Sequence, residues 1–549
     1  MAEYDVVLIH PPSFYDFRRG PWFPGPIDRT VPNYTPAFIM FPIGLISMGA
    51  YIQDNGFKVK IINLAEKMIV EKDFDVEHFL RGLNSKIYAV DLHWAVHSQG
   101  AIMIAQICKK HHPDSKVILG GLTATCFADE LVSSFNFIDC VVRGEGEEPL
   151  LRLVESFNDS KVFHQIPNLT FLDKNGEIAR TESLEVFDSI DSLDFTRLDL
   201  VEPVNRTITS VFYRSKLWNI PICRGCTLSC VTCGGSSYSY QRLMNRSTPA
   251  FRSPEKILED LMILDEKKIG SIFLFQDPRL GGEKYVRQLF EVLKGEKWSS
   301  ITSIGIELFH PAGKSFIRYL SENKPADHIG LSISPESGLE SVRRSQGREY
   351  SNDELLKTCR YCREYDVPIG IFYMIALGNE TFETIRETWK LWKKIYSLED
   401  RLSRRPRIFQ DFGPMIFLDP GSLAFDHPER YGYKLRFKKF QDYYSAMNSP
   451  HWSQWISYET KNLSRQDVAY MILKSAEKLL EYKKIFGRIR EKEYENEKLI
   501  LNLDKIFIRE FDELMKMEDE EDRNNRIREL AEISKDPLLS LSYILTEDE

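Results

Sequence analysis

Short apolar runs alternate with helix-length segments over residues 1–155, and this alternation is the strongest constraint on the fold. We interpret residues 5–9, 58–64, 87–92, 116–120 and 138–143 as strands. Helix-length segments lie between or after them, at residues 42–55, 76–83, 99–112, 128–135 and 147–157. Strands that alternate with helices at this spacing favour right-handed crossovers and a parallel sheet. Residues 1–155 are therefore predicted to form a doubly wound α/β domain.

The composition places the chain among multidomain globular proteins. The 549 residues are 43% hydrophobic and 28% charged, with a formal net charge of −9. This composition excludes a wholly disordered chain. A net acidic charge argues against a general nucleic-acid binder, which needs a basic face.

No targeting or membrane-spanning segment is predicted. Residues 1–8 contain Glu3 and Asp5 and lack the basic start and apolar core of a signal peptide. The longest uncharged run, residues 30–53, contains three prolines, and its densest part is shorter than the roughly 20 residues of a membrane span. We therefore expect a cytoplasmic protein without a transmembrane segment.

The carboxyl ends of the predicted strands carry glycines and polar residues, and a doubly wound sheet binds ligands at these ends. Gly120 and Gly121 would let the backbone approach a ligand closely. Residues 143–147 form a glycine-rich turn into a helix start, which could hold a phosphate. No G-x-G-x-x-G follows the first strand, so a dinucleotide site is weakly supported. Ordinary βα connections remain the alternative explanation for each glycine turn.

Three of the nine cysteines, Cys226, Cys230 and Cys233, have the spacing C-x3-C-x2-C. Three thiolates on one tight loop can hold three irons of a 4Fe-4S cube and leave the fourth iron open to a small molecule. Structural zinc sites normally use four protein ligands, so this spacing favours the cluster. Cys223, and the Cys359 and Cys362 pair on a predicted helix, are interpreted as structural.

A second block of strands and helices follows the cysteines, and two further segments complete the chain. Its predicted strands are residues 216–222, 271–275, 303–308, 329–334, 368–375 and 414–418, with helices at 254–267, 283–293, 353–365 and 380–396. Residues 156–205 are predicted to be a linker with a hairpin at 168–172 and 177–180. Residues 426–549 are predicted to be helical, at 437–447, 465–486, 488–512 and 521–534, and to form either a cap over the substrate pocket or plain scaffolding.

Two parts of the chain resemble known families. The C-x3-C-x2-C motif after a strand, followed by further βα units, resembles the partial (β/α)6 barrel of radical S-adenosylmethionine (SAM) enzymes over residues 206–425. His10-Pro11-Pro12, residues 42–45, the Gly120-Gly121 turn and residues 143–148 together resemble the cobalamin-binding domain of cobalamin-dependent radical SAM enzymes. The resemblance implies three cofactors, namely a 4Fe-4S cluster on Cys226, Cys230 and Cys233, SAM, and cobalamin.

The resemblance also implies roles for residues at the strand ends. It places SAM against Gln276, Ser334, Glu336 and Tyr373, and it makes Glu307, His310 and Tyr373 candidate catalytic residues. It places cobalamin against Gly120, Gly121, Thr123 and Glu145, with its lower face over His93 and His97. The D-x-H-x-x-G motif of histidine-ligated cobalamin domains is absent after the first strand, so histidine ligation of cobalt is not expected.

The activity implied by the resemblance is methylation of an unactivated carbon through a 5′-deoxyadenosyl radical. Radical cyclisation, coupling or rearrangement of a lipid or pigment without methyl transfer is the main alternative. A methylthiotransferase would need a second cluster, but Cys108, Cys126 and Cys140 are too far apart in the sequence to suggest one. A cobalamin or redox sensor would need a signalling domain, and the sequence pattern does not indicate one. We expect a small-molecule or lipid-like substrate, with Trp22, Phe23, Tyr34 and Phe38 as candidate pocket residues, and an electron donor such as ferredoxin or flavodoxin.

Overall fold

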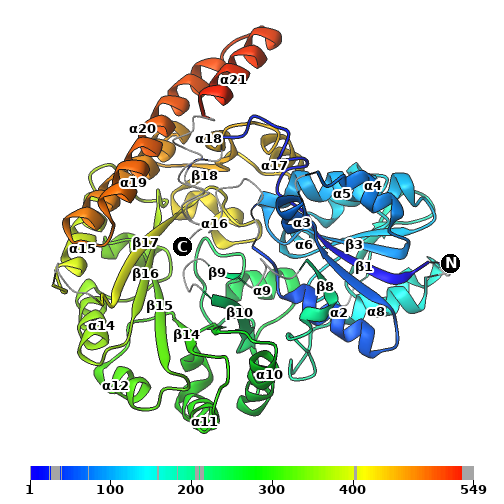
Figure 1. Ribbon diagram of the computed structural model, residues 1–549. Helices are drawn as coiled ribbons and strands as arrows, with labels where there is room; N and C mark the ends of the chain where they lie inside the picture. The colour runs from blue at the N-terminus through cyan, green and yellow to red at the C-terminus, as the bar shows by residue number, and fades with distance from the viewer. Residues whose placement is uncertain are drawn as a thin grey trace.

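The protein consists of two α/β units that lie side by side, with C-terminal helices packed against both (Figure 1). The computed structural model describes residues 2–534 apart from positions 24, 26–37, 39, 72, 158–159, 182–183, 204–208, 211–214 and 401–404. Tyr34 lies outside the described residues. The described elements agree with the predicted class, which combines a doubly wound sheet, a partial barrel and a helical C-terminal part.

The first unit is built on an eight-stranded sheet in the order β7-β6-β5-β4-β3-β1-β2-β8. Strands β1 to β5 are parallel, and the chain order reverses between β1 and β3. The strands are β1 (Tyr4–His10), β2 (Val59–Asn63), β3 (Ser85–Asp91), β4 (Lys116–Gly120), β5 (Cys140–Val142), β6 (Leu169–Leu172), β7 (Ile178–Arg180) and β8 (Val201–Glu202).

Helices cover both faces of this sheet because successive residues of a strand point to opposite faces. Val6 and Leu8 of β1 pack in one core with the helices α2 and α8, whereas Val7 and Ile9 pack in the other core with α5. The helices are α2 (Gly44–Asp54), α3 (Leu64–Val70), α4 (Val76–Gly82), α5 (Ser98–His111), α6 (Leu122–Cys126), α7 (Ala128–Ser134) and α8 (Glu147–Glu155). The predicted doubly wound arrangement is therefore present.

The segment predicted to be a linker contributes strands to the first sheet. The predicted hairpin forms as β6 and β7, and β6 pairs antiparallel with β5. Strand β8 extends the opposite edge by pairing with β2. These strands satisfy backbone groups that the edges of the parallel sheet would otherwise leave unpaired.

The second unit contains six parallel strands in chain order, joined by helices, which form the predicted partial barrel. The strands are β10 (Ser215–Pro221), β13 (Ser271–Phe275), β14 (Ser303–Leu308), β15 (His328–Glu336), β16 (Ile369–Ile375) and β17 (Ile408–Pro414), with β9 (Thr209–Ser210) antiparallel at one edge. The helices are α10 (Pro254–Glu266), α11 (Gly282–Lys294), α12 (Lys314–Glu322), α13 (Glu340–Ser345), α14 (Asn352–Glu364) and α15 (Ile385–Tyr396).

The sixth strand lies earlier in the chain than predicted. The apolar run 414–418 suggested a strand, but β17 spans Ile408–Pro414 and pairs with β16 from Ile408 onward. The alternation of apolar and polar residues that marks a strand is interrupted in β17. The buried position between Ile408 and Phe412 is the polar residue Gln410, which is 3% exposed and hydrogen-bonded within the core. Residues 415–418 are instead a buried loop.

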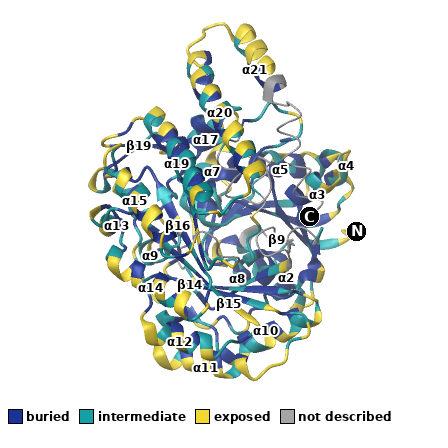
Figure 2. Ribbon diagram, turned by 60° about the vertical axis from the view of Figure 1, so that its left-hand side comes forward, coloured by how far each residue is buried: buried dark blue, intermediate teal, exposed yellow. Residues whose placement is uncertain are grey.

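The C-terminal part combines helices with a small two-stranded sheet. Its elements are α16 (Leu423–Asp426), β18 (Tyr433–Leu435), α17 (Phe440–Ala446), α18 (Trp452–Trp455), β19 (Tyr458–Thr460), α19 (Arg465–Ile485), α20 (Glu491–Leu514) and α21 (Glu520–Ser534). Short 3-10 helices elsewhere span Ala95–His97, Ser160–Gln165, Leu198–Leu200, Pro278–Gly281 and Pro428–Tyr431. Helices α20 and α21 project from the body, and much of their surface is exposed (Figure 2).

The segment after β1 contacts the C-terminal part. Phe23 packs between Phe507 and Phe511 of α20, with ring centroids 5.0 and 4.8 Å away. Trp22 stacks on Phe14 at 4.4 Å, and Phe14 in turn contacts Trp455. Trp22 and Phe23 therefore pack between the first unit and the C-terminal part. They were predicted as possible residues of a substrate pocket, and packing is the other role that they can have.

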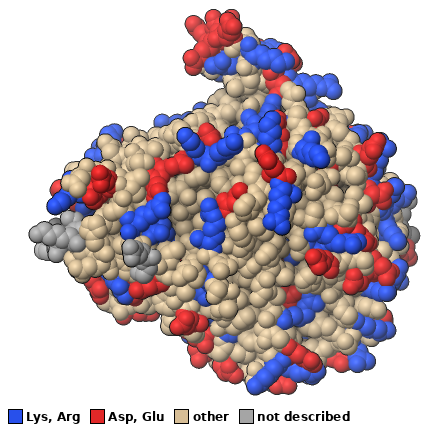
Figure 3. Space-filling view, turned by 180° about the vertical axis from the view of Figure 1, so that it is seen from behind, with Lys and Arg blue, Asp and Glu red and all other residues tan. Residues whose placement is uncertain are grey.

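Charged side chains of both signs are interspersed over the face shown in Figure 3. In the described part of the chain, no helix combines the length and the apolar character that crossing a bilayer requires.

Candidate functional site

The three motif cysteines lie on the loop between β11 (Cys223–Arg224) and α9 (Ser237–Met244), directly after the first barrel strand. Cys226 and Cys230 are half-buried and Cys233 is exposed, whereas Cys223 is buried with its thiol against the carbonyl of Gly225. Cys359 and Cys362 are both buried on α14. The structure thus places the three predicted ligands on one partly exposed loop and buries Cys223, Cys359 and Cys362.

Backbone hydrogen bonds hold the cysteine loop. The N–H of Leu228 donates to Sγ of Cys226 (3.4 Å), and the N–H of Gly235 donates to Sγ of Cys233 (3.3 Å). The N–H of Gly234 donates to the carboxylate of Asp419 (2.8 Å). Hydrogen bonds to ligating sulfurs tune iron–sulfur clusters, so this donor pattern suits such a group.

The donor set also fits a cluster better than a single ion. Burial raises the pKa of the Cys226 thiol, and it raises that of Cys230 to about 11, so a positive metal centre is needed to keep these groups as thiolates. Among the described residues no three His, Cys, Asp or Glu side chains converge on one metal-sized point. Thiolates that each bind a different iron need not converge in this way.

A cavity of about 430 Å³ adjoins the cysteine loop at the carboxyl ends of β15, β16 and β17. We call it the barrel cavity. Its walls include Cys230, Thr232 and Cys233 together with the predicted SAM contacts Ser334, Glu336 and Tyr373. Phe372, Met374, Phe412, Met415 and Phe417 give it an apolar side.

Glu336 and Arg348 form a charged pair in the wall of this cavity. Glu336 Oε1 accepts a long hydrogen bond from Arg348 Nη2 (3.4 Å), and Glu336 has φ = +64° at an irregularity of β15. Burial raises the pKa of Glu336. In the described structure the Nε of Arg348, a residue of the cavity wall, and the hydroxyl of Tyr350 are buried without a hydrogen-bond partner. Sequence reasoning missed Arg348, which lies outside the strand ends.

The remaining candidates around the barrel mouth are not on the walls of the barrel cavity. The N–H of Gln276 donates to Glu307 Oε2 (3.0 Å), and the amide oxygen of Gln276 is buried without a partner among the described residues. Burial raises the pKa of Glu307. The carbonyl of His310 accepts from Arg279, and burial lowers the pKa of its imidazole.

Tyr373, a predicted catalytic residue, is almost fully buried. Its side chain is 1% exposed, its hydroxyl donates to Gln410 Oε1 (3.2 Å), and its ring contacts Trp392. The Tyr373 hydroxyl therefore points into the layer between the barrel and its helices. We assign this residue to packing and to the cavity wall instead of proton transfer.

A second cavity, of about 190 Å³, lies at the carboxyl edge of the first sheet. We call it the first-sheet cavity. The predicted residues Gly120, Gly121, His93 and Glu145 are on its walls. Gly121 has φ = +108°, and a Cβ there would lie 2.6 Å from the Cα of His93, so only glycine fits. An apolar cavity with glycine walls at this edge suits part of a large planar or nucleotide-like ligand.

Thr123 and His97, which were also predicted to contact cobalamin, are buried next to the first-sheet cavity and are not on its walls. Thr123 is 2% exposed, and its hydroxyl donates to the carbonyl of His93 (3.0 Å). His97 is fully buried, with Nε2 against the carbonyl of Phe38 (3.1 Å) and no partner for Nδ1 among the described residues.

His10 and Asp91 form a buried pair that the sequence did not reveal. They end β1 and β3, the two strands between which the order of the sheet reverses, and His10 Nδ1 lies 3.0 Å from Asp91 Oδ2. The His10 ring packs 4.9 Å from that of His97, and burial lowers the pKa of both histidines to about 3. The carboxylate of Asp91 thus pairs with the imidazole of His10.

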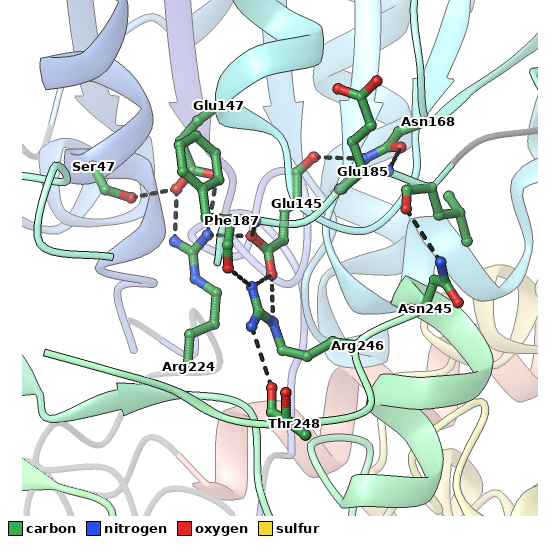
Figure 4. A network of polar contacts seen from close by, with 11 residues as sticks. Ser47, Glu145, Glu147, Asn168, Glu185, Phe187, Arg224, Asn245, Arg246 and Thr248 are labelled. Atoms are coloured by element: carbon green, nitrogen blue, oxygen red, sulfur yellow. Dashed lines mark hydrogen bonds and ion pairs between the residues drawn. The ribbon is translucent and has the colours of Figure 1, made fainter. Parts of the chain in front are cut away.

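The turn at residues 143–147 does not present an anion site. Its acidic residues Glu145 and Glu147 are bonded to Arg224 and Arg246 from the second unit (Figure 4). Two buried carboxylates at the start of α8 would repel a phosphate. Glu145 lies on the wall of the first-sheet cavity, but its carboxylate is used in this contact between the units.

Comparison with protein-family models finds two matches. Residues 30–154 match the B12 binding domain, and residues 220–391 match the radical SAM superfamily. The chain contains a radical SAM domain and a B12-binding domain. The family predicted from the two sets of motifs is confirmed, as is the fold class. The first-sheet cavity lies at the edge of the B12-binding domain, and the cysteine loop lies in the radical SAM domain.

Two relatives are similar to this chain at low sequence identity. The anaerobic magnesium-protoporphyrin IX monomethyl ester cyclase of Rubrivivax gelatinosus is 21% identical over 374 residues, which are 65% of this chain and 62% of the cyclase. The match thus spans less than two thirds of that relative. An uncharacterized methyltransferase of Pyrococcus horikoshii is 24% identical over 401 residues, which are 72% of this chain and 79% of the relative.

A solved structure shares the fold. The radical SAM methyltransferase TsrM from Kitasatospora setae, determined with cobalamin and a 4Fe-4S cluster bound, has a TM-score of 0.55 and 16% identity, covering 79% of this chain and 81% of TsrM. The cofactors predicted for this chain, a 4Fe-4S cluster, SAM and cobalamin, are those of its two domain types.

Proposed function

We propose that the protein is a cobalamin-dependent radical SAM enzyme that methylates an unactivated carbon of a small-molecule or lipid-like substrate. One observation carries the proposal. Arg224, Tyr240 and Met244, which flank the three cysteines in the chain, also complete the wall of the first-sheet cavity. A ligand of the B12-binding domain and a cluster on the cysteine loop would therefore be neighbours.

The cofactors would supply the difficult chemistry. Cys226, Cys230 and Cys233 would hold the 4Fe-4S cluster, which would supply the electron for cleavage of SAM to methionine and a 5′-deoxyadenosyl radical. The first-sheet cavity would hold part of cobalamin, which would supply the methyl group for the substrate carbon. The electron comes from a donor such as ferredoxin or flavodoxin.

The residues of this chain bind and orient these groups. We propose that Cys226, Cys230 and Cys233 ligate the cluster and leave one iron for SAM. Ser334, Glu336 and Arg348 would bind polar groups of SAM in the barrel cavity, and its apolar side would exclude water from the radical. Gln276 would contribute its unpartnered amide oxygen, and Glu307 would position Gln276.

At the barrel mouth, His310 remains a candidate for contact with the substrate. In the B12-binding domain, Gly120, Gly121 and His93 would contact cobalamin, with Thr123 and His97 behind them. In the described structure no carboxylate is hydrogen-bonded to the ring of His93 on the cavity wall, as one would be behind a strong metal-binding histidine, since Asp91 bonds to the ring of His10.

Radical cyclisation without methyl transfer is the second candidate, and the cyclase relative favours it. The two activities differ in what becomes of SAM. Methyl transfer consumes one SAM for the methyl group, which leaves S-adenosylhomocysteine, and a second SAM for the radical, which ends as 5′-deoxyadenosine. Cyclisation forms 5′-deoxyadenosine without S-adenosylhomocysteine.

The test uses protein purified without oxygen, with iron, sulfide and corrin counted. It is incubated with SAM and a strong reductant, and both nucleoside products are measured. Formation of both products by corrin-loaded protein supports methyl transfer, and 5′-deoxyadenosine alone supports the second candidate. Protein that holds a cluster but retains no corrin after gel filtration would refute the cobalamin role.

A further inference from the structure

A single carboxylate of the B12-binding domain is bonded to both ends of the segment that carries the cysteines. This segment, residues 225–245, contains the cysteine loop and α9, and we call it the cysteine segment. Arg224 precedes it and donates from Nη1 to Glu145 Oε2 (3.1 Å). Arg246 follows it and donates from Nε to Glu145 Oε1 (2.7 Å). Figure 4 shows both guanidinium groups converging on Glu145.

Neighbouring contacts fix the position of this carboxylate. The N–H of Phe187 donates to Glu145 Oε2 (3.0 Å), and Asn168 donates to the carbonyl of Glu145 (3.1 Å). Arg224 also donates from Nη2 to Glu147 Oε1 (2.6 Å), and the hydroxyl of Ser47 on α2 donates to the same oxygen (2.9 Å). The cluster therefore joins two carboxylates and two guanidinium groups without net charge.

The four charged side chains of this cluster are largely buried, and burial restricts the positions that they can adopt. The side chains of Glu145, Glu147 and Arg246 are between 2 and 4% exposed, and that of Arg224 is 16% exposed. Removing one partner of a buried ion pair leaves an uncompensated charge, so the alternatives to this geometry are costly. Arginine also fixes the angle of approach, because its planar fork binds carboxylates through two bonds.

The path from Arg224 to the first cluster ligand is short and tightly packed. Only Gly225 separates Arg224 from Cys226, and Gly225 has φ = +104°. A Cβ at Gly225 would lie 3.0 Å from Cδ of Arg246 and 3.1 Å from Cα of Pro249. A shift of Arg224 would therefore move Cys226 with it.

We propose that Glu145 is a positioning residue that sets where the cysteine segment lies relative to the first-sheet cavity. The inference rests on the proposed function, because it concerns the distance between the groups that the two sites hold. It assigns a role to the acidic turn that differs from cofactor contact. Loss of the Glu145 carboxylate should change that distance without emptying either site.

The test compares Glu145→Gln and Arg246→Lys with a matched control, Glu148→Gln. Glu148 lies in the first turn of α8, just after Glu145 in the chain, but its carboxylate bonds to Tyr51 and Arg152 of its own domain. Arg246→Lys keeps the charge and loses the two-pronged geometry. It serves as the conservative variant if Glu145→Gln folds poorly.

Two measurements report position and not merely stability. The first is the magnetic interaction between the reduced cluster and Co(II), measured by electron paramagnetic resonance on protein loaded with both. The second is the ratio of methylated product or S-adenosylhomocysteine to 5′-deoxyadenosine. SAM cleavage needs only the cluster and SAM, so 5′-deoxyadenosine should form in all variants.

We expect Glu145→Gln and Arg246→Lys to retain iron and corrin at wild-type stoichiometry, with an altered magnetic interaction. The product ratio should fall about tenfold or more, because a misplacement near 1 Å can cost two orders of magnitude in rate. Glu148→Gln should match the wild type in both measurements. If both variants match Glu148→Gln while wild-type protein holds both cofactors, the positioning role is wrong. Wild-type protein that binds no corrin would instead overturn the proposed function.

Discussion

The buried carboxyl of Glu380 should make the stability of the barrel depend on pH. Glu380 is fully buried beyond the end of β16. Its Oε1 accepts from the hydroxyl of Ser337 (2.9 Å), and its Oε2 accepts from the N–H groups of Ala376 (3.0 Å) and Leu377 (3.1 Å). No cation bonds to it in the described structure, and burial outweighs these three donors and raises its pKa to about 7.

The sign and size of the effect follow from linkage. The folded protein binds this proton more tightly than the unfolded chain, whose glutamate has a pKa of 4.5. The stabilisation is therefore complete below about pH 4.5 and is lost as pH rises through about 7. The full window corresponds to about 3 kcal/mol, of which about 2 kcal/mol is lost between about pH 5.5 and about pH 8.

The substitution Glu380→Gln removes the titration and keeps a shape that can accept the two backbone N–H groups. Melting temperatures of the metal-free protein at about pH 5.5 and about pH 8 provide the assay. For a unit of about 200 residues, 2 kcal/mol corresponds to about 4–8 °C. Wild type should lose this much more than Glu380→Gln over the interval, and Glu383→Gln, an exposed neighbour, should behave as wild type. Parallel curves for wild type and Glu380→Gln would refute the reasoning.

Three further predictions concern the two sites. Cys226→Ala should abolish both the cluster absorbance and the cleavage of SAM, whereas Cys359→Ala should keep both; a full cluster in Cys226→Ala would remove this residue from the ligand set. Glu336→Ala should raise the SAM concentration needed for half-maximal cleavage about tenfold while iron content stays unchanged, since a charge-assisted hydrogen bond contributes about 1.5–3 kcal/mol; unchanged SAM affinity would exclude Glu336 from the site. Gly121→Ala should weaken cobalamin binding and leave the cluster intact, because its Cβ would clash with the backbone of His93; wild-type corrin retention after gel filtration would contradict this.

Local patterns in the sequence were sufficient for most of the architecture. Strands β4, β13 and β14 have the predicted ends, and α10, α14 and α19 differ from prediction by one residue at one or both ends. These elements show apolar periodicity that matches their own geometry, which is a property of neighbouring residues. The cysteine spacing is local in the same sense. Strand β17 was misplaced because buried Gln410 breaks its pattern, and its partner Tyr373 lies 37 residues away.

The pairs between residues that lie far apart in the sequence were decided only by the tertiary structure. Glu145 meets Arg224 and Arg246 from 79 and 101 residues away, and His10 meets Asp91 across 81 residues. Nothing in a local pattern distinguishes an acidic turn that binds a ligand from one that binds a distant arginine. That choice depends on which edges of two folded units come together, and on the need of each buried charge for a partner. The sequence by itself thus determined the two domain types and predicted three cysteines as cluster ligands, whereas the packing of the domains determined how their sites face each other.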